Sequence, residues 1–162
     1  MNIEDLLRDD EPAILEEAAA AVTGLEHYGR DGADATRRRL EALYQHLAEA
    51  VCARDLDPLL AHSGRIARER FAAGFELAEV QAAFARLEGA IARHALDRLP
   101  PGELAWGLGL VTTALAHATG ELGRTFATLA PRPWAGVDLS GVFRRSTAPA
   151  RSRSAEELVY PV

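Results

Sequence analysis

The chain contains no lysine, and its 18 basic residues are all arginines in a sequence of 162 residues. Without a lysine amine the chain cannot be a Schiff-base enzyme, use a lysine as general base or carry a Walker-type phosphate loop. Exclusive use of arginine, together with many alanines and leucines, is typical of a GC-rich bacterial coding bias.

Cysteine is almost as scarce, with Cys52 as the single example. One thiol can form neither an intrachain disulfide nor a cysteine cluster, so we expect a reducing cytoplasm as the compartment. Cys52 lies between Val51 and Ala53 in a helical pattern. This position predicts a small buried side chain rather than a reactive thiol.

The sequence offers little that could target or span a membrane. Acidic side chains crowd the segment 1–11, where a secretory signal would have a basic region followed by an apolar run. The long uncharged stretch at 104–120 only reaches the lower length limit for crossing a bilayer, and it contains several glycines. We therefore expect no membrane partner, and a helix buried on most sides within the domain.

Helical periodicity dominates the segment 1–130, and no useful strand-like alternation occurs. Proline, glycine and capping residues mark the expected helix ends. Six helices are expected, at 2–8, 12–23, 33–54, 57–73, 77–99 and 102–129, with a glycine-containing connection at 24–32. The expected fold is all-α, either a globin-like crossed packing or a simple up-and-down helical bundle.

The most informative segment spans 67–87, where a helix, a sharp corner and a strongly amphipathic helix follow one another. Gly74 can adopt the left-handed conformation that ends a helix, and Phe75 can fold back onto the preceding turn. We expect Arg70 to pack its stem under Phe75 and to cap the last helical carbonyls with its guanidinium. Leu77 and Val80 begin the next apolar stripe.

This corner has an Arg-x-x-x-Gly-hydrophobic-x-Leu-x-x-Val pattern, which resembles the N-terminal domain of the RsbRD family, the RsbT co-antagonist group of bacterial stress-signalling proteins. The resemblance covers roughly 6–129. It implies that residues 1–130 form a non-haem, globin-like, homodimeric regulatory or sensor domain. Such a domain acts through protein–protein interaction in stress or two-component signalling, with a kinase or an anti-sigma-pathway component as partner. Family members usually continue into an output module, whereas here only the segment 131–162 follows.

Residues 131–162 differ in composition from the rest of the chain. They are rich in proline, glycine, arginine and serine, which predicts a flexible, disordered tail. The tail has a net charge of +2, whereas the segment 1–130 has 13 arginines against 21 carboxylates, a net of −8. A candidate docking motif stands at its end: Leu158, Val159, Tyr160, Pro161 and Val162. The alternative is a solvated tail without a specific role.

Histidines are the residues most able to bind a metal in this sequence. His46, His94 and His117 lie on three different expected helices and together could bind zinc, nickel or iron. No HxxxH or HExxH pair and no strand-borne catalytic motif occurs. We therefore expect no enzyme and no cofactor, with a metal or haem sensor as the alternative. His62 and His94 are its candidate axial ligands.

Two further patterns concern partners. A small-molecule sensor, the other alternative, would have an internal apolar pocket near Phe84, Ile91, Trp106 and Val111. A homodimer could use small residues of the last helix for close approach: Gly107, Ala114, Ala118 and Gly120.

The helix, glycine corner and helix superficially match a DNA-binding helix-turn-helix. The first turn of the second helix would then present Glu76 and Glu79 to the phosphates. A domain with a net charge of −8 also lacks the cations that give non-specific affinity, so we expect no nucleic acid partner.

Overall fold

The computed structural model describes residues 1–131. These residues form seven helices and no strand, which confirms the predicted all-α class. The helices are α1 (Ile3–Asp9), α2 (Glu11–Thr23), α3 (Glu26–Asp31), α4 (Ala33–Ala53), α5 (Asp57–Ala72), α6 (Leu77–Arg98) and α7 (Pro101–Leu129). The predicted tail and its motif, Leu158, Val159, Tyr160, Pro161 and Val162, lie outside the described residues.

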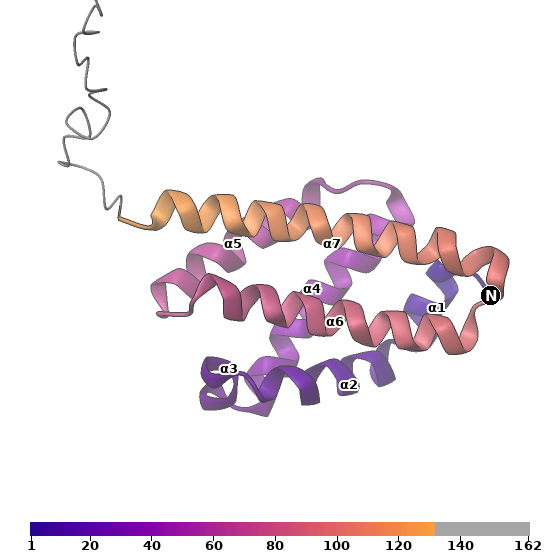
Figure 1. The fold of residues 1–162 in the computed structure, drawn as a ribbon, viewed down its shortest axis with the longest axis horizontal. Coiled ribbons are helices and arrows are strands. Elements are labelled where there is room, and N and C mark those ends of the chain that lie inside the picture. The colour runs from indigo at the N-terminus through magenta and orange to yellow at the C-terminus, as the bar shows by residue number, and fades with distance from the viewer. Residues whose placement is uncertain (132–162) are drawn as a thin grey trace, which may run out of the picture. The chain divides into compact units, whose positions relative to one another are not determined.

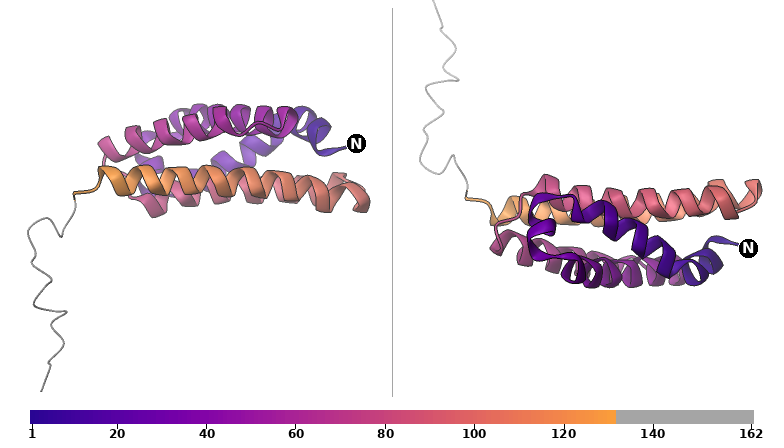
Figure 2. Two further views of the ribbon diagram at one scale, coloured as in Figure 1. Left: turned by 90° about the horizontal axis from the view of Figure 1, so that it is seen from above. Right: turned by 90° about the horizontal axis from the view of Figure 1, so that it is seen from below.

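Five of these helices close a ring around the apolar core. Contacts join α2 to α6, α6 to α7, α7 to α5, α5 to α4 and α4 back to α2. α6 and α7 lie side by side in one layer, and the other helices pack against that layer (Figure 2). α4 crosses behind α6 and α7 at a steep angle (Figure 1). The packing of residues 1–131 is therefore crossed rather than strictly up-and-down.

The first helix shows how local sequence and core contacts together fix an element. Asn2 Oδ1 accepts a hydrogen bond from the Asp5 backbone N–H at 2.8 Å, and the Asp5 side chain accepts one from the Asn2 N–H, forming a capping box. The buried Tyr44 hydroxyl of α4 donates to the Leu7 carbonyl at 2.7 Å. Thus α1 is held at its start by its own cap and at its end by α4.

The predicted apolar stripes form the core. On α6 the stripe runs through Val80, Phe84, Leu87, Ile91 and Ala95, all buried. On α7 it runs through Val111, Leu115 and Leu122, also buried. Spacings of three and four place each set on one side of its helix, which removes apolar surface from water.

The connection expected at 24–32 contains a helix, so this part of the prediction was wrong. A Cβ added to Gly29 of α3 would lie 2.8 Å from the Thr23 carbonyl oxygen, closer than real Cβ contacts allow. Glycine at this position therefore permits α3 to pack against the end of α2. Thr36 of α4 is buried and donates its hydroxyl to the Tyr28 carbonyl at 3.2 Å, which adds a second attachment.

Three of the four small residues expected at a dimer contact are buried within the chain. Ala114 and Ala118 are buried, and a Cβ on Gly107 would lie 2.9 Å from Ile3 Cβ. Gly107 therefore allows α1 to approach the start of α7. Three of the four predicted residues are thus used within one chain, and only Gly120 is partly exposed.

Candidate functional site

The corner after α5 is a Schellman motif, with Gly74 in the left-handed region at φ 81°. The Phe75 N–H donates to the Arg70 carbonyl at 2.9 Å, and the Gly74 N–H donates to the Phe71 carbonyl at 3.1 Å. Backbone groups therefore cap these two carbonyls, a role that the sequence assigned to the guanidinium of Arg70. That assignment was wrong.

Arg70 instead packs against the aromatic ring that follows the corner. Its side chain is only 6% exposed, and its guanidinium carbon lies 5.4 Å from the centroid of the Phe75 ring. This is cation–π distance, so the predicted association of Arg70 with Phe75 is present in a different form. Val80 is fully buried and Leu77 is half-buried, so both belong to the core side of α6.

Phe75 joins the corner to α3 and α4. Its ring lies 5.1 Å from that of Tyr28 in an edge-on arrangement and 4.8 Å from that of His27. From α4, the guanidinium carbon of Arg39 lies 5.8 Å from the same ring. Phe75 is 6% exposed, so the five predicted corner residues form a structural junction rather than an open binding site.

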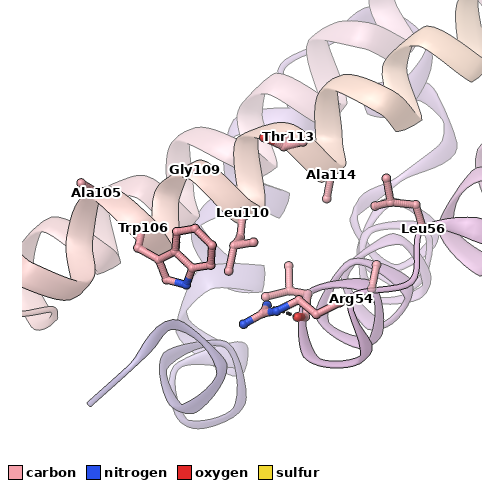
Figure 3. Close-up of a pocket in the computed structure, with 10 residues that line it drawn as sticks. Arg54, Leu56, Ala105, Trp106, Gly109, Leu110, Thr113 and Ala114 are labelled. Atoms are coloured by element: carbon pink, nitrogen blue, oxygen red, sulfur yellow. Dashed lines mark hydrogen bonds between the residues drawn. The ribbon is translucent and has the colours of Figure 1, made fainter.

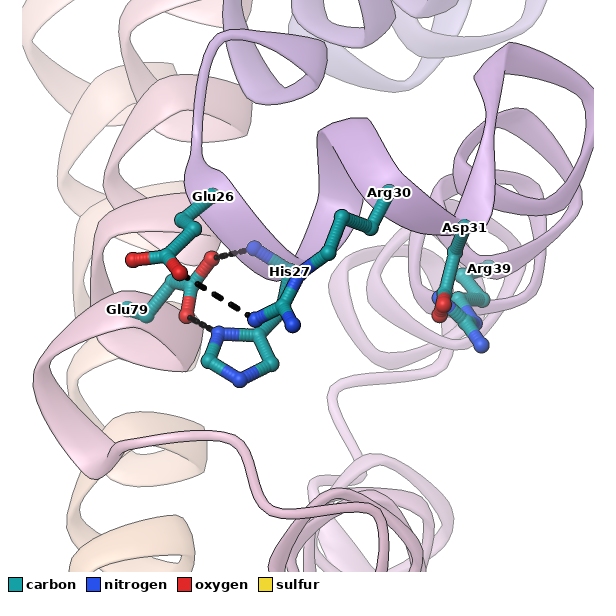
Figure 4. Close-up of polar contacts among 6 residues, drawn as sticks. All are labelled: Glu26, His27, Arg30, Asp31, Arg39 and Glu79. Carbon is teal, nitrogen blue, oxygen red and sulfur yellow. Dashed lines mark hydrogen bonds and ion pairs between the residues drawn. The ribbon is translucent and has the colours of Figure 1, made fainter.

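Polar contacts reinforce this junction from outside (Figure 4). The Glu79 carboxylate of α6 accepts from the His27 backbone N–H at 2.6 Å and meets His27 Nδ1 at 2.6 Å. Arg39 of α4 pairs with Asp31 of α3 at 2.5 Å. Since Glu79 is occupied in this way, the carboxylate expected to repel DNA has a structural partner in α3.

The histidines considered as metal ligands have separate partners. The rings of His46 and His62 lie 4.3 Å apart, whereas His94 contacts the carboxylates of Asp10 and Glu17. His117 is exposed on α7. Within residues 1–131, no group of three or more His, Cys, Asp or Glu side chains is arranged to hold a metal ion.

Two expectations about burial were wrong. Cys52 is exposed near the end of α4, although its apolar neighbours predicted a buried thiol. The stretch 104–120 was expected to be buried on most sides, yet part of it forms an exposed, uncharged surface at helical spacing. We call this surface the outer face of α7; it consists of Ala105, Trp106, Gly109, Thr112, Thr113, Ala116 and His117.

An apolar groove of about 430 Å³ runs along the outer face, between α7 and the end of α4 (Figure 3). Its apolar lining consists of Ala50, Val51, Leu56, Ala105, Trp106, Leu110 and Ala114. Gly109, Thr113 and Arg54 complete it. The guanidinium of Arg54 is held by the Val51 carbonyl and, at 2.6 Å, by Glu4. It is therefore fixed at the rim of the groove.

The sequence predicts Trp106 as a possible ligand-binding residue, but its environment in the structure differs from the one expected. The sensor alternative placed it in an internal pocket with Phe84, Ile91 and Val111, and those three side chains are buried in the core. Trp106 is 61% exposed. A tryptophan in an uncharged run was the available signal for the groove, but the run alone does not tell which side of the helix faces solvent.

The sequence matches no protein-family model, no curated protein and no solved structure. The family resemblance of the corner therefore stays a prediction. No helix within residues 1–131 is both long enough and apolar enough to cross a membrane.

Proposed function

We propose that this chain is a non-enzymatic regulatory domain that binds a helix of a protein partner along the outer face of α7. The observation that carries the proposal is the exposed Trp106 beside an apolar groove, on a helix face without a single charge. Residues 1–130 have a net charge of −8, so an uncharged face of this length stands apart from the rest of the surface.

The physics of protein interfaces supports this choice of surface. Interface centres are depleted of charged residues, and tryptophan is enriched among the residues that dominate binding energy. Ala105, Gly109 and Thr113 repeat at steps of four along α7, so a second helix can approach its backbone closely. An amphipathic helix that lays its apolar side into the groove is the partner that fits.

The corner pattern supports placing this domain in bacterial stress or two-component signalling, in the cytoplasm. The helix in the groove would then come from a kinase, from an anti-sigma-pathway component or from a second copy of this chain. In each case the segment that fits the groove is an amphipathic helix with its apolar side toward Trp106, and regulation consists of occupying or releasing the groove.

A matched pair of substitutions tests the proposal. Ala105→Glu places a carboxylate in the groove, whereas Ala20→Glu places one on the exposed side of α2. We expect Ala105→Glu to abolish complex formation in pull-downs from the native cell and Ala20→Glu to leave it intact. Light scattering on the pure protein distinguishes a second copy of this chain from a different partner, because only self-association can occur in that sample. Equal behaviour of the two variants in both assays would contradict the proposal.

A further inference from the structure

A second recess, on the side of α4 that faces α5, has a different chemistry from the groove. We call it the arginine pocket. It has a volume of about 260 Å³, and α4 contributes Arg38 and Arg39 while α5 contributes His62, Glu69 and Arg70. Ile66 and two alanines supply its apolar surface. Three arginines thus line one pocket in a domain whose net charge is −8.

Two buried donors in the lining have no acceptor within residues 1–131. Arg70 is 6% exposed, and its Nε makes no hydrogen bond. His62 is 7% exposed, and its Nε2 makes none either. His46 Nδ1, on the ring 4.3 Å from that of His62, is a third buried atom without a partner in this part of the chain. A buried polar group without a hydrogen-bond partner is destabilising, so these groups beside one pocket favour the binding of a ligand that supplies acceptors.

The hydrogen bonding of His62 fixes what the ring can offer. Arg65 Nη2 lies 2.7 Å from His62 Nδ1, and because a guanidinium can only donate, Nδ1 is the acceptor. Nε2 therefore carries the hydrogen and is a donor. Burial, followed by the positive charges of His46, Arg65 and Arg70, lowers the pKa of His62 to about 4, so the ring donates as a neutral group at pH 7.

The charges around the pocket are only partly balanced. Asp31 pairs with Arg39 at 2.5 Å, and Glu69 lies exposed at the rim. Among the described residues, neither Arg38 nor Arg70 forms an ion pair. The pocket therefore presents donors and positive charge from both of its walls.

We propose that the arginine pocket binds the phosphate group of a small phosphorylated metabolite. A tetrahedral oxyanion offers acceptor oxygens in several directions, so it can satisfy Arg38 and Arg39 on one wall and His62 and Arg70 on the other. The pocket has room for a small organic group beside Ile66. The near-complete burial of Arg70 and His62 favours a small ligand over a macromolecule. This site is separate from the groove, and neither proposal depends on the other.

The test is calorimetric titration of the full chain with inorganic phosphate and with glycerol 3-phosphate, in sodium chloride buffers of matched ionic strength. We expect saturable binding that Arg38→Gln weakens about tenfold, the loss expected for one charge-assisted hydrogen bond. Arg38 is exposed and makes no ion pair among the described residues, so this variant keeps the fold. Arg37→Gln is the matched control, because Arg37 is its neighbour on α4, pairs with Glu41 and does not line the pocket.

A nuclear magnetic resonance titration gives a second readout. Bound phosphate should raise the pKa of His62 and slow the exchange of its Nε2 hydrogen, which general screening by salt does not do. Absence of binding, equal loss in Arg37→Gln and Arg38→Gln, or an unchanged His62 would each overturn the proposal. Tighter binding of succinate than of either phosphate would overturn the assignment of the ligand class.

Discussion

Phe75 illustrates how much of this structure depends on single side chains. It follows a left-handed glycine and contacts Tyr28 of α3, Arg39 of α4 and Arg70 of α5. If the chain did not turn at Gly74, the ring would not reach these three helices. The conformation of one glycine is thus linked to the attachment of α3 to the rest of the domain.

The first prediction concerns Gly74→Ala. A left-handed residue with a Cβ costs about 1–2 kcal/mol, and no atom lies within 4 Å of the added carbon, so backbone strain is the whole effect. We expect the free energy of unfolding to fall by that amount in urea denaturation. Gly123→Ala is the control, since Gly123 is helical and equally open, and the change should stabilise by about 0.5–1 kcal/mol. Equal effects of both variants would refute the account of the corner.

The second prediction concerns pH and His62, which faces His46, Arg65 and Arg70. Its pKa is about 4 in the folded protein, below the ordinary 6.5 of the unfolded chain. Between these values the unfolded state binds more protons, so the contribution of His62 to stability is present above pH 6.5 and is lost as the pH falls toward 4.

The size of this effect can be isolated with His62→Gln, which cannot titrate. Between pH 7 and pH 4.5 the wild type should lose about 2 kcal/mol more stability than the variant, measured by denaturation across the pH range. Parallel stability curves for the two proteins would show that His62 titrates as an ordinary exposed histidine.

At the scale of elements, α3 shows a helix that its own sequence does not start. Leu25 precedes it and gives no side-chain cap. Glu79, far from His27 along the chain, accepts the His27 N–H in place of a local cap. The helical conformation of this short segment therefore depends on a contact with α6 as well as on its own sequence.

This leads to the third prediction, for Glu79→Ala. Loss of the shared acceptor should destabilise the domain by about 1–2 kcal/mol and speed hydrogen exchange in α3. Glu76→Ala is the control, because the Glu76 side chain is exposed and caps nothing. Its effect should stay within about 0.5 kcal/mol. Unchanged exchange in α3 of Glu79→Ala would disprove the cap.

Some elements of this fold can be predicted from local sequence patterns, whereas α3 cannot. The stripe from Val80 to Ala95 and the corner at Gly74 are local patterns, and both were predicted. α3 was missed because Gly29, normally a sign of a connection, is required by close packing against Thr23. Its cap also comes from a distant helix, which no local window contains.

At the scale of the whole molecule, the outer face of α7 is the feature that the sequence predicted least well. The lack of charge over 104–120 predicts burial on most sides, but the hydrophobic stripe and the opposite face of α7 are both free of charge, so this signal does not distinguish them. Only the packing of α4, α5 and α6 around the stripe decides which side stays open. Trp106 could therefore be noticed in the sequence but not placed.

The fourth prediction separates binding from folding at Trp106. The side chain is 61% exposed, so Trp106→Ala should change the free energy of unfolding by no more than about 0.5 kcal/mol. Binding of the helical partner should weaken by about 2 kcal/mol or more, as for a central interface tryptophan, measured by titration of the purified complex components. A large loss of stability with intact binding would show that Trp106 stabilises the fold and not the complex.

Site-specific photo-cross-linking in the native cell shows most directly whether a partner occupies the outer face of α7. A photoreactive amino acid replaces Trp106 in one sample and Arg86, an exposed residue of α6, in another. We expect a defined cross-linked protein from position 106, either a second copy or a partner, joined through the apolar side of one of its helices. Cross-links of equal yield and identity from both positions would show that the outer face of α7 is not a specific binding surface.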